Sequence, residues 1–346
     1  MADVAQRAGV SRMTVSRVIN DGAKVREDTR QAVLAAIREL NFRPNLAARN
    51  LVMIGELRIG VVYNNPSAAF MSDFLIGVFE EATRAGARLI LVRGEGGQAP
   101  SPGELEGLLR SGVHGVVLAP PLGESAAVRG VLRAADIPIA VVAAGRPAGD
   151  TINVRIDDRE ASARMARHLL DLGHRRIGFV IGNPEQTASA ERLAGARAAV
   201  EAVEGAELLL AQGAFSYASG VGAAEALLDT EPPPTAIFAS NDDMAAAAVS
   251  VAHRRRLDVP RDLTVVGFDD TTVATTLWPP LTTIRQPVRQ MAAVALDRLI
   301  RAVRSEDASD ASADHVLDHV LIERQSTAPP RVAPSADATD KRSSHA

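Results

Sequence analysis

Short β-rich segments alternate with helical segments along most of this chain, and this alternation limits the possible folds more than any other feature. The strand-like segments form two series, 57–63, 87–93, 114–120 and 138–144, then 176–182, 207–211, 235–240 and 263–270. Their runs of Val, Ile and Leu are typical of strands buried on both faces of a parallel sheet. Eight such strands are too many for one small sheet, so we expect two doubly wound parallel α/β lobes.

The first fifty residues differ from the rest in pattern and in charge. Helical spacing predicts short helices over Asp3–Ala8, Ser11–Asn20 and about Glu27–Leu40, with a tight turn at Gly9 and with Ser11 as the N-cap of the second helix. Nine Lys/Arg and five Asp/Glu give residues 1–50 a formal charge of +4, whereas the remainder, with 29 and 37, carries −8. A basic helical head on an acidic body predicts that the head alone contacts phosphate.

Several function classes lack their sequence signals. The 346 residues contain no run of eighteen apolar residues, no secretory signal pattern and no cysteine, so we expect a cytoplasmic protein without a membrane partner. We find neither the glycine pattern of a dinucleotide or triphosphate site nor a recognisable Ser/His/Asp set, and we expect no enzyme, cofactor or metal. His168 and His174 have the spacing of neither a zinc site nor a phosphate loop, which favours helix, loop and strand there.

Motifs along the whole chain resemble the LacI/GalR family of transcriptional repressors. DVAQRAGVSRMTVSRVIND at 3–21 and Arg-Pro-Asn at 43–45 stand in the family's order and spacing. Further matching motifs lie in the body, at 172–182, 192–195, 238–245, 265–270 and 279–287. The resemblance implies a small all-α helix-turn-helix headpiece, followed by a core with two parallel-sheet lobes of periplasmic-binding-protein type. The texture of 62–70 resembles a proteobacterial subgroup that senses glucosides or disaccharides.

The resemblance also implies domain boundaries. We expect a headpiece over 1–43, a hinge helix or linker over 44–54, an effector-binding and dimerisation core over 55–325, and a disordered tail over 326–346. The expected N-lobe comprises about 55–154 and 285–310, and the expected C-lobe about 155–284 and 311–325. Family members usually carry several residues before Asp-Val-Ala, so we expect the true start codon to lie upstream of Met1.

The second helix of the head is the expected recognition helix, because the N-terminal end of that helix enters the major groove in helix-turn-helix proteins. On the face opposite its apolar residues, three side chains are candidates for base contacts: Arg12, Met13 and Arg17. Small hydroxyl donors suited to phosphate oxygens are Ser11, Thr14 and Ser16. An ordinary amphipathic helix with a solvated arginine face is the alternative.

The segment 44–54 resembles the family's hinge. By resemblance it forms a short helix on operator DNA, with Leu51 wedged into the minor groove and with Asn45 and Arg49 facing the DNA backbone. Without DNA, the same segment is simply a linker.

Polar residues at strand ends, or on the helices that follow, predict an effector site. Open α/β sheets bind ligands at the carboxyl ends of their strands, so we expect a cleft between the lobes. By resemblance four residues hold sugar hydroxyls: Arg146, Arg192, Asn241 and Asp269. Their side chains supply the paired donors and acceptors that vicinal hydroxyls need. By resemblance Phe215 stacks on a sugar ring, and further candidates are Asn65, Phe70 and Gln286.

Three of these residues also have structural alternatives. Asn241 could N-cap the helix over 241–256, and Asp269 could cap the element after its strand. Phe215 could pack at the rim of the cleft instead of stacking on a ligand.

The resemblance implies a dimeric repressor of carbohydrate-utilisation genes that binds a pseudo-palindromic operator in the nucleoid. Its effector would be a monosaccharide, a disaccharide or a glucoside, and the direction of its effect on DNA binding stays open. The alternatives are a periplasmic-type sugar-binding protein without a DNA role, and a regulator that responds to a purine or another small molecule.

Overall fold

The computed structural model describes residues 2–11, 14–15, 18, 26–39, 57–94, 98–304 and 314–331. The chain divides into two compact units, Met1–Glu56 and Leu57–Ala346. Within the described residues, no helix is both long and apolar enough to cross a membrane.

The first unit contains the helices α1 (Ala2–Arg7) and α3 (Glu27–Glu39). Gly9 has a φ of 65°, a conformation that glycine adopts without steric cost, and it turns the chain after α1. Ser11 then accepts a hydrogen bond at its Oγ from the backbone N of Thr14 (3.1 Å), which confirms Ser11 as an N-cap. Among the described residues of this unit, the buried apolar side chains form a small cluster of Val4, Ala5, Val15, Val18, Val33 and Ala36.

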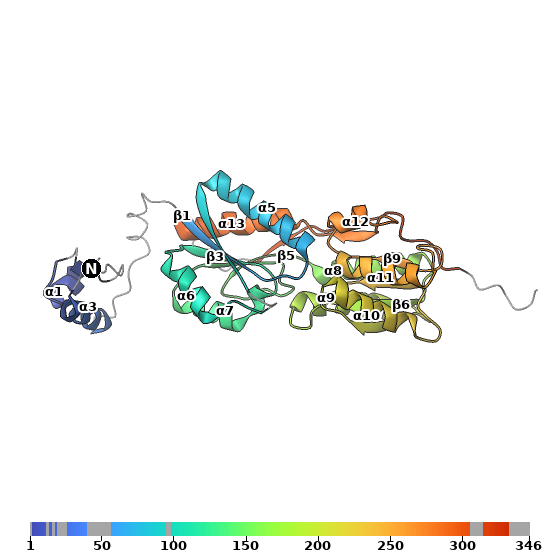
Figure 1. Cartoon of the computed structure of the whole chain (residues 1–346), viewed down its shortest axis with the longest axis horizontal. Helices are drawn as coiled ribbons and strands as arrows, with labels where there is room; N and C mark the ends of the chain where they lie inside the picture. Colours follow the sequence, from blue (N-terminus) through green and yellow to red (C-terminus); the bar gives the residue numbers. More distant parts are fainter. Residues whose placement is uncertain are drawn as a thin grey trace, which may run out of the picture. The chain divides into compact units, whose positions relative to one another are not determined.

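The N-lobe of the second unit is a six-stranded parallel sheet in the order β11-β5-β4-β3-β1-β2. Its strands are β1 (Leu57–Tyr63), β2 (Ala87–Arg93), β3 (Gly115–Leu118), β4 (Ile139–Val142), β5 (Ile152–Ile156) and β11 (Asp314–Leu317). The sheet is covered by α5 (Ala68–Ala85) and α13 (Val288–Arg304) on one face and by α6 (Pro102–Arg110) and α7 (Ala126–Ala134) on the other (Figure 1). Every residue of β3 and β4 is buried, as the apolar runs predicted.

The helices α5 and α13 approach closely. A Cβ atom on Gly77 of α5 would lie 2.1 Å from the carbonyl oxygen of Arg289 in α13, so a glycine is required at this contact. Because α13 follows α5 by more than two hundred residues, this contact joins two distant parts of the chain within the N-lobe.

The C-lobe is a four-stranded parallel sheet in the order β7-β6-β8-β9. Its strands are β6 (Arg176–Ile181), β7 (Glu207–Gln212), β8 (Ala236–Ala239) and β9 (Thr264–Val266). Its helices are α8 (Asp158–Asp171), α9 (Thr187–Glu201), α10 (Tyr217–Leu228), α11 (Asp242–Arg254) and the short α12 (Thr272–Thr276). The helices α10 and α11 share one apolar cluster with β8 and β9, and α8 packs against α9 (Figure 1).

The chain passes between the lobes three times: after β5, through β10 (Thr283–Arg285) into α13, and back after β11 through β12 (Val320–Ile322). The strands β10 and β12 pair antiparallel, and Ile284 of β10 also accepts a hydrogen bond at its carbonyl oxygen from the backbone N of Asp269 (2.8 Å). These strands bring residues just after β9 next to residues that lead into the N-lobe.

The structure corrects two of the expected boundaries. β11 at Asp314–Leu317 pairs with β5 in the N-lobe, although we placed 311–325 in the C-lobe. Arg155 of β5 makes a two-pronged ion pair with Asp314 (2.9 and 2.8 Å), a contact between residues too distant in sequence for periodicity to indicate.

The predicted disordered tail begins too early. Residues 326–331 are described and pack on the C-lobe, whereas 332–346 lie outside the described residues. Ser326 is fully buried, with its Oγ donating to the carbonyl of Val265 (2.6 Å), and the backbone N of Val265 donates to the carbonyl of Ser326 (3.0 Å). Polar composition suggested disorder, but these polar groups satisfy the backbone beside β9.

Candidate effector-binding cleft

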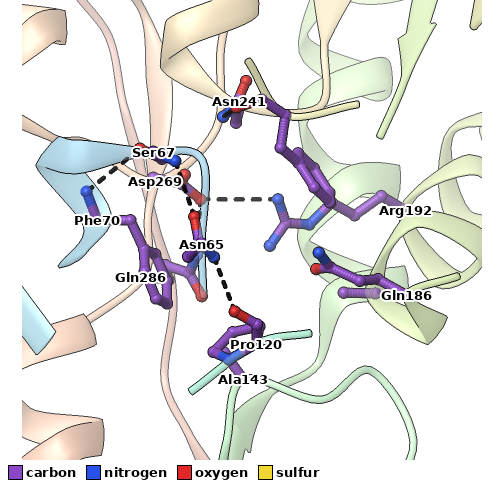
Figure 2. Close-up of a pocket in the computed structure, with 12 residues that line it drawn as sticks. Asn65, Ser67, Phe70, Pro120, Ala143, Gln186, Arg192, Asn241, Asp269 and Gln286 are labelled. Atoms are coloured by element: carbon purple, nitrogen blue, oxygen red, sulfur yellow. Dashed lines mark hydrogen bonds and ion pairs between the residues drawn. The ribbon is translucent and has the colours of Figure 1, made fainter. Parts of the chain in front are cut away.

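A cleft lies between the two lobes of the core, and we call it the effector cleft. Its N-lobe wall consists of Asn65, Ser67, Phe70, Pro120 and Ala143. Its C-lobe wall consists of Gln186, Ala188, Arg192, Phe215, Asn241 and Asp269, and Gln286 joins from the crossing segment (Figure 2). Seven of the eight predicted ligand-binding residues therefore lie together, at the carboxyl ends of strands from both sheets.

Arg192 on α9 is held by several acceptors. Its Nε donates to Asp158 (2.7 Å), its Nη1 donates to the carbonyl oxygen of Ser240 (2.6 Å), and the same Nη1 lies 3.6 Å from a carboxylate oxygen of Asp269 (Figure 2). The guanidinium carbon lies 3.7 Å from the ring centroid of Phe268. These contacts fix the plane of the guanidinium at the cleft wall.

Asp269 follows β9 with a φ of 115°, and its carboxylate accepts a hydrogen bond from Nε2 of Gln286 (2.6 Å). Positive φ values at non-glycine residues cost energy and gather at functional sites. Six such residues occur in the described part of the chain, and three of them, Ala143, Phe215 and Asp269, line the cleft. The residues with positive φ values therefore indicate the same candidate site as the polar side chains do.

Burial changes the ionisation of three carboxyl groups around Arg192. Burial raises the pKa of Asp158, against the lowering effect of Arg192. Burial and the nearby Asp269 raise the pKa of Asp242 well above its ordinary value. Burial also raises the pKa of Asp269 to about 7, although Arg192 and Gln286 lower it. One guanidinium does not compensate three buried carboxylates, and the pKa of about 7 leaves Asp269 partly protonated near neutral pH.

Asn241 confirms one structural alternative from the sequence. Its Oδ1 caps α11 by accepting from the backbone N of Met244 (3.0 Å), and its Nδ2 donates to the carbonyl of Phe215 (3.0 Å). Phe215 is itself buried and packs where a Cβ on Gly182 would lie 2.1 Å from its ring. Both residues line the cleft and shape it, so their structural and ligand-facing roles are compatible.

Asn65 and Phe70 supply the N-lobe side. Asn65 donates from Nδ2 to the carbonyl of Pro120 (3.2 Å) and accepts at Oδ1 from the backbone N of Ser67 (2.9 Å). The Oγ of Ser67 in turn caps α5 by accepting from the backbone N of Phe70 (3.3 Å). Figure 2 shows this chain of contacts, which fixes the start of α5 beside the cleft.

Arg146 is the predicted ligand residue that does not line the cleft. Its Nε donates to Glu191 on α9 (2.6 Å), and most of its side chain is exposed. The carboxylate of Glu191 is a stronger partner for a guanidinium than a neutral hydroxyl. The structure therefore places Arg146 outside the cleft lining.

Gln186 was missed. It follows β6 and precedes α9, so the rule of strand carboxyl ends that indicated Arg192 would have indicated it too. Within the described residues, Nε2 of Gln186 and Oε1 of Gln286 are buried without a hydrogen-bond partner. A buried donor and a buried acceptor of this kind are costly unless a ligand or water satisfies them.

The predicted DNA contacts divide between described and undescribed residues. Ser11 and Thr14 are described, and their hydroxyl oxygens lie 2.9 Å apart at the start of the second helix. Seven other predicted contacts lie outside the described residues: Arg12, Met13, Ser16, Arg17, Asn45, Arg49 and Leu51. In the described ranges, no group of three or more His, Asp or Glu side chains is arranged to bind a metal ion.

Comparisons with known proteins agree with this arrangement. The family described as "Bacterial regulatory proteins, lacI family" matches residues 1–45, and a "Periplasmic binding protein-like domain" matches residues 166–327. Catabolite control protein A of Priestia megaterium is 32% identical over 328 residues, which cover 94% of this chain and 98% of that protein.

Two solved structures also match nearly the whole chain. A complex of the transcriptional regulator CelR with cellobiose has a TM-score of 0.71 and 32% identity. The lac repressor dimer bound to operator and an anti-inducer has a TM-score of 0.69 and 28% identity. Each match covers 94% of this chain and 98% of the other.

Proposed function

We propose that this protein, which belongs to the lacI family of bacterial regulatory proteins, is a dimeric repressor whose affinity for operator DNA changes when a sugar binds in the effector cleft. Membership of the family makes the chain a DNA-binding transcriptional regulator and not an enzyme. The regulated genes would be those of carbohydrate utilisation. Since the protein acts on the chromosome, its place is the cytoplasm, in association with the nucleoid.

The observation that carries the sugar assignment is the set of polar groups on the cleft walls. The guanidinium of Arg192 and the carboxylate of Asp269 lie side by side, and the amides of Gln186 and Gln286 add a free donor and a free acceptor among the described residues. Vicinal hydroxyls donate and accept at the same spacing, and therefore satisfy such a set. Phe70 and Phe215 supply apolar surface for the face of a sugar ring.

The CelR structure contains cellobiose, and another structure of a lacI-family regulator, 25% identical to this chain, contains ribose. These two structures support a carbohydrate as the effector, whereas relatives named PurR, 32% and 33% identical to this chain, match the purine alternative.

For the DNA side, we assign base contacts to Arg12, Met13 and Arg17, and phosphate contacts to Ser11, Thr14 and Ser16. Asn45, Arg49 and Leu51 act in the hinge. Family members bind operator DNA as dimers, so two heads on a two-fold axis would match a pseudo-palindromic operator. Effector binding would change operator affinity by the differential binding energy between two states of the core, typically ~1–3 kcal/mol.

A thermal-shift panel on the full chain tests the proposal, with cellobiose, glucose, ribose and hypoxanthine as probes. A ligand at about one hundred times its Kd stabilises the native state by ~2.7 kcal/mol, which is a readily measured shift. We expect a sugar to raise the melting temperature and to be recovered unchanged. A shift with hypoxanthine alone would contradict the sugar assignment and support the purine alternative.

Operator DNA selected from a random duplex pool then tests the regulatory role. We expect the sugar that binds the core to change the Kd of the full chain for the selected duplex. Sugar binding without sequence-specific DNA binding would instead support the periplasmic-type alternative.

A further inference from the structure

Away from the cleft-lining side chains, a carboxylate of the N-lobe caps a helix of the C-lobe. Glu124 ends a short 3₁₀ turn, η1 (Leu122–Glu124), that follows β3. Its Oε2 accepts a hydrogen bond from the backbone N of Thr187 (2.7 Å), and its Oε1 accepts one from the Oγ1 of Thr187 (2.9 Å). Thr187 is the first residue of α9, and the N-cap residue of α9, Gln186, makes no side-chain capping bond. Glu124 therefore supplies this cap from the other lobe.

A second N-lobe segment meets the same threonine. The backbone N of Arg146 donates to Oγ1 of Thr187 (2.9 Å), so one hydroxyl joins two N-lobe loops to the start of α9. A Cβ on Gly145 would lie 2.4 Å from the backbone N of Ala188, and this close approach requires a glycine. Arg146 also reaches Glu191, one turn further along α9.

The hydrogen bonds of Glu124 and Glu191 offset part of the cost of burying their carboxylates. A carboxylate at the N-terminus of a helix is stabilised by the helix dipole and by its charge-assisted bond to the backbone N–H. Burial raises the pKa of Glu124, whereas the hydrogen bonds from Thr187 lower it. For Glu191, the hydrogen bonds from Arg159 and Arg146 outweigh burial and lower its pKa. All of these groups are polar and at least partly exposed, so water can satisfy them when the lobes separate.

The cleft itself requires such separation. The cleft has a volume of only about 30 Å³, which is room for about two waters. A sugar therefore enters only when the lobes move apart, and the contacts between the lobe edges must break and re-form.

We propose that Glu124 is an interlobe latch, a positioning residue that closes the effector cleft by capping α9 through Thr187 and so sets the lifetime of the bound effector. The proposal rests on the proposed function, because the effector it retains is the one assigned to the cleft. Glu124 does not line the cleft, so its influence on binding passes through lobe closure and through α9, which carries Arg192. When only the closed state retains ligand, the apparent affinity falls in proportion to the closed fraction.

The first experiment measures lobe separation without any ligand. The chain has no cysteine, so Ala134→Cys on α7 and Ala198→Cys on α9 would carry one spin label on each lobe. Both positions are exposed. Labelled full chain diluted into unlabelled chain limits the measured distances to single subunits.

In this background, Glu124→Gln and Thr187→Val should each shift the interlobe distance distribution to longer or broader values. Glu106→Gln is the matched control, because Glu106 pairs with Arg110 on its own helix and loses the same charge. An unchanged distribution in both latch variants, at unchanged melting temperature, would overturn the proposal. Two chemically different variants guard against a folding defect in one of them.

The second experiment follows dissociation of cellobiose, or of whichever panel sugar binds. We expect Glu124→Gln to raise the dissociation rate about three- to tenfold with little change in the association rate, and Glu106→Gln to leave both unchanged. If the variants shift the interlobe distance but none of the panel sugars binds the protein, only the proposed function is contradicted. Normal dissociation from Glu124→Gln would contradict the latch alone.

Discussion

At the scale of single residues, the cleft wall is a cluster of buried charges whose pairing is incomplete. Arg192 is almost fully buried between Asp158 and Asp269, and Asp242 lies behind them with its carboxylate accepting from Thr271 and Thr283. A buried ion pair contributes little net stability compared with apolar packing, and an uncompensated carboxylate costs several kcal/mol. Buried charged groups with perturbed pKa values in a cleft indicate a functional site, because a polar ligand can supply the pairing that they lack.

Asp269→Asn should lower effector affinity at least tenfold, which is about 1.4 kcal/mol, because an NH2 donor replaces one of the two acceptor oxygens of the carboxylate. Operator affinity should stay unchanged, so the variant would not respond to effector. Isothermal titration with the identified sugar and fluorescence anisotropy with operator DNA measure the two affinities. Asp229→Asn, at an exposed ion pair with Arg255, is the control. Retained effector affinity in Asp269→Asn would exclude Asp269 from the site.

The effect of Asp269→Asn on the melting temperature should depend on pH. The pKa of Asp269 is raised to about 7, so the folded state binds this proton more tightly than the unfolded state does. Its contribution to stability is complete below the unfolded pKa of about 3.9 and is lost as pH rises through 7. The melting temperature of Asp269→Asn relative to the parent should therefore increase between pH 5 and pH 8. A constant difference across that range would contradict the raised pKa.

At the scale of elements, the segment 326–331 forms hydrogen bonds along the edge of the C-lobe sheet, although it is not itself a β-strand. Besides its bonds to Val265, Ser326 accepts at Oγ from the backbone N of Thr282 (2.9 Å). The carbonyl of Ala328 accepts from Nε2 of His174 (3.0 Å), whose Nδ1 lies 2.9 Å from the hydroxyl of Thr235. The Nε2–H tautomer satisfies both contacts, with Thr235 donating. Burial lowers the pKa of His174, which keeps the ring neutral.

Ending the chain at Gln325 should destabilise the core, because the backbone N of Val265 and Nε2 of His174 would lose their partners. Buried groups without partners cost ~1–3 kcal/mol each, so we expect the two groups together to lower the free energy of unfolding by ~2–6 kcal/mol. Chemical denaturation of the full chain, and of chains that end at Gln325 and at Arg331, measures the free energy of unfolding. Ending the chain at Arg331 is the matched control and should have no effect. Equal stability of both truncations would show that 326–331 does not hold the C-lobe.

At the scale of the whole molecule, regulation requires that the head and the effector cleft act on one equilibrium. The basic head and the acidic core belong to separate compact units, so the two binding activities are separable by mutation. Linkage then requires that effector and operator change each other's affinity by the same factor.

Arg17→Ala should weaken specific operator binding by ~1–3 kcal/mol, because it removes the base contact that we propose for Arg17, and should leave sugar binding intact. Arg7→Ala is the control: it removes the same charge from the head, but Arg7 pairs with Glu39 and does not lie on the predicted recognition helix. Anisotropy titrations with operator and with unrelated DNA separate specific from general binding. If the two variants lose equal affinity for operator, the placement of the recognition helix is wrong.

Much of this molecule could be predicted from the sequence, for a physical reason. Strands buried on both faces leave an apolar run that is visible locally, and parallel sheets bring the carboxyl ends of those strands to one edge. The position of Arg192, Asn241 and Asp269 at one cleft could therefore be predicted without a structure, and so could the cap at Ser11. The family resemblance added Phe215, and Asn65, Phe70 and Gln286 were further candidates from the N-lobe and the crossing segment.

The tertiary structure decided what depends on contacts between distant residues. It turned Arg146 toward Glu191 and away from the cleft, paired β11 with β5, and ordered 326–331 against β9. It left Gln186 with a buried donor facing the cleft and gave Glu124 a partner in the other lobe. Local pattern encodes which face of a helix or strand is buried. Which polar group meets which other group is determined only when the lobes pack, because long-range contacts compete for the same donors and acceptors.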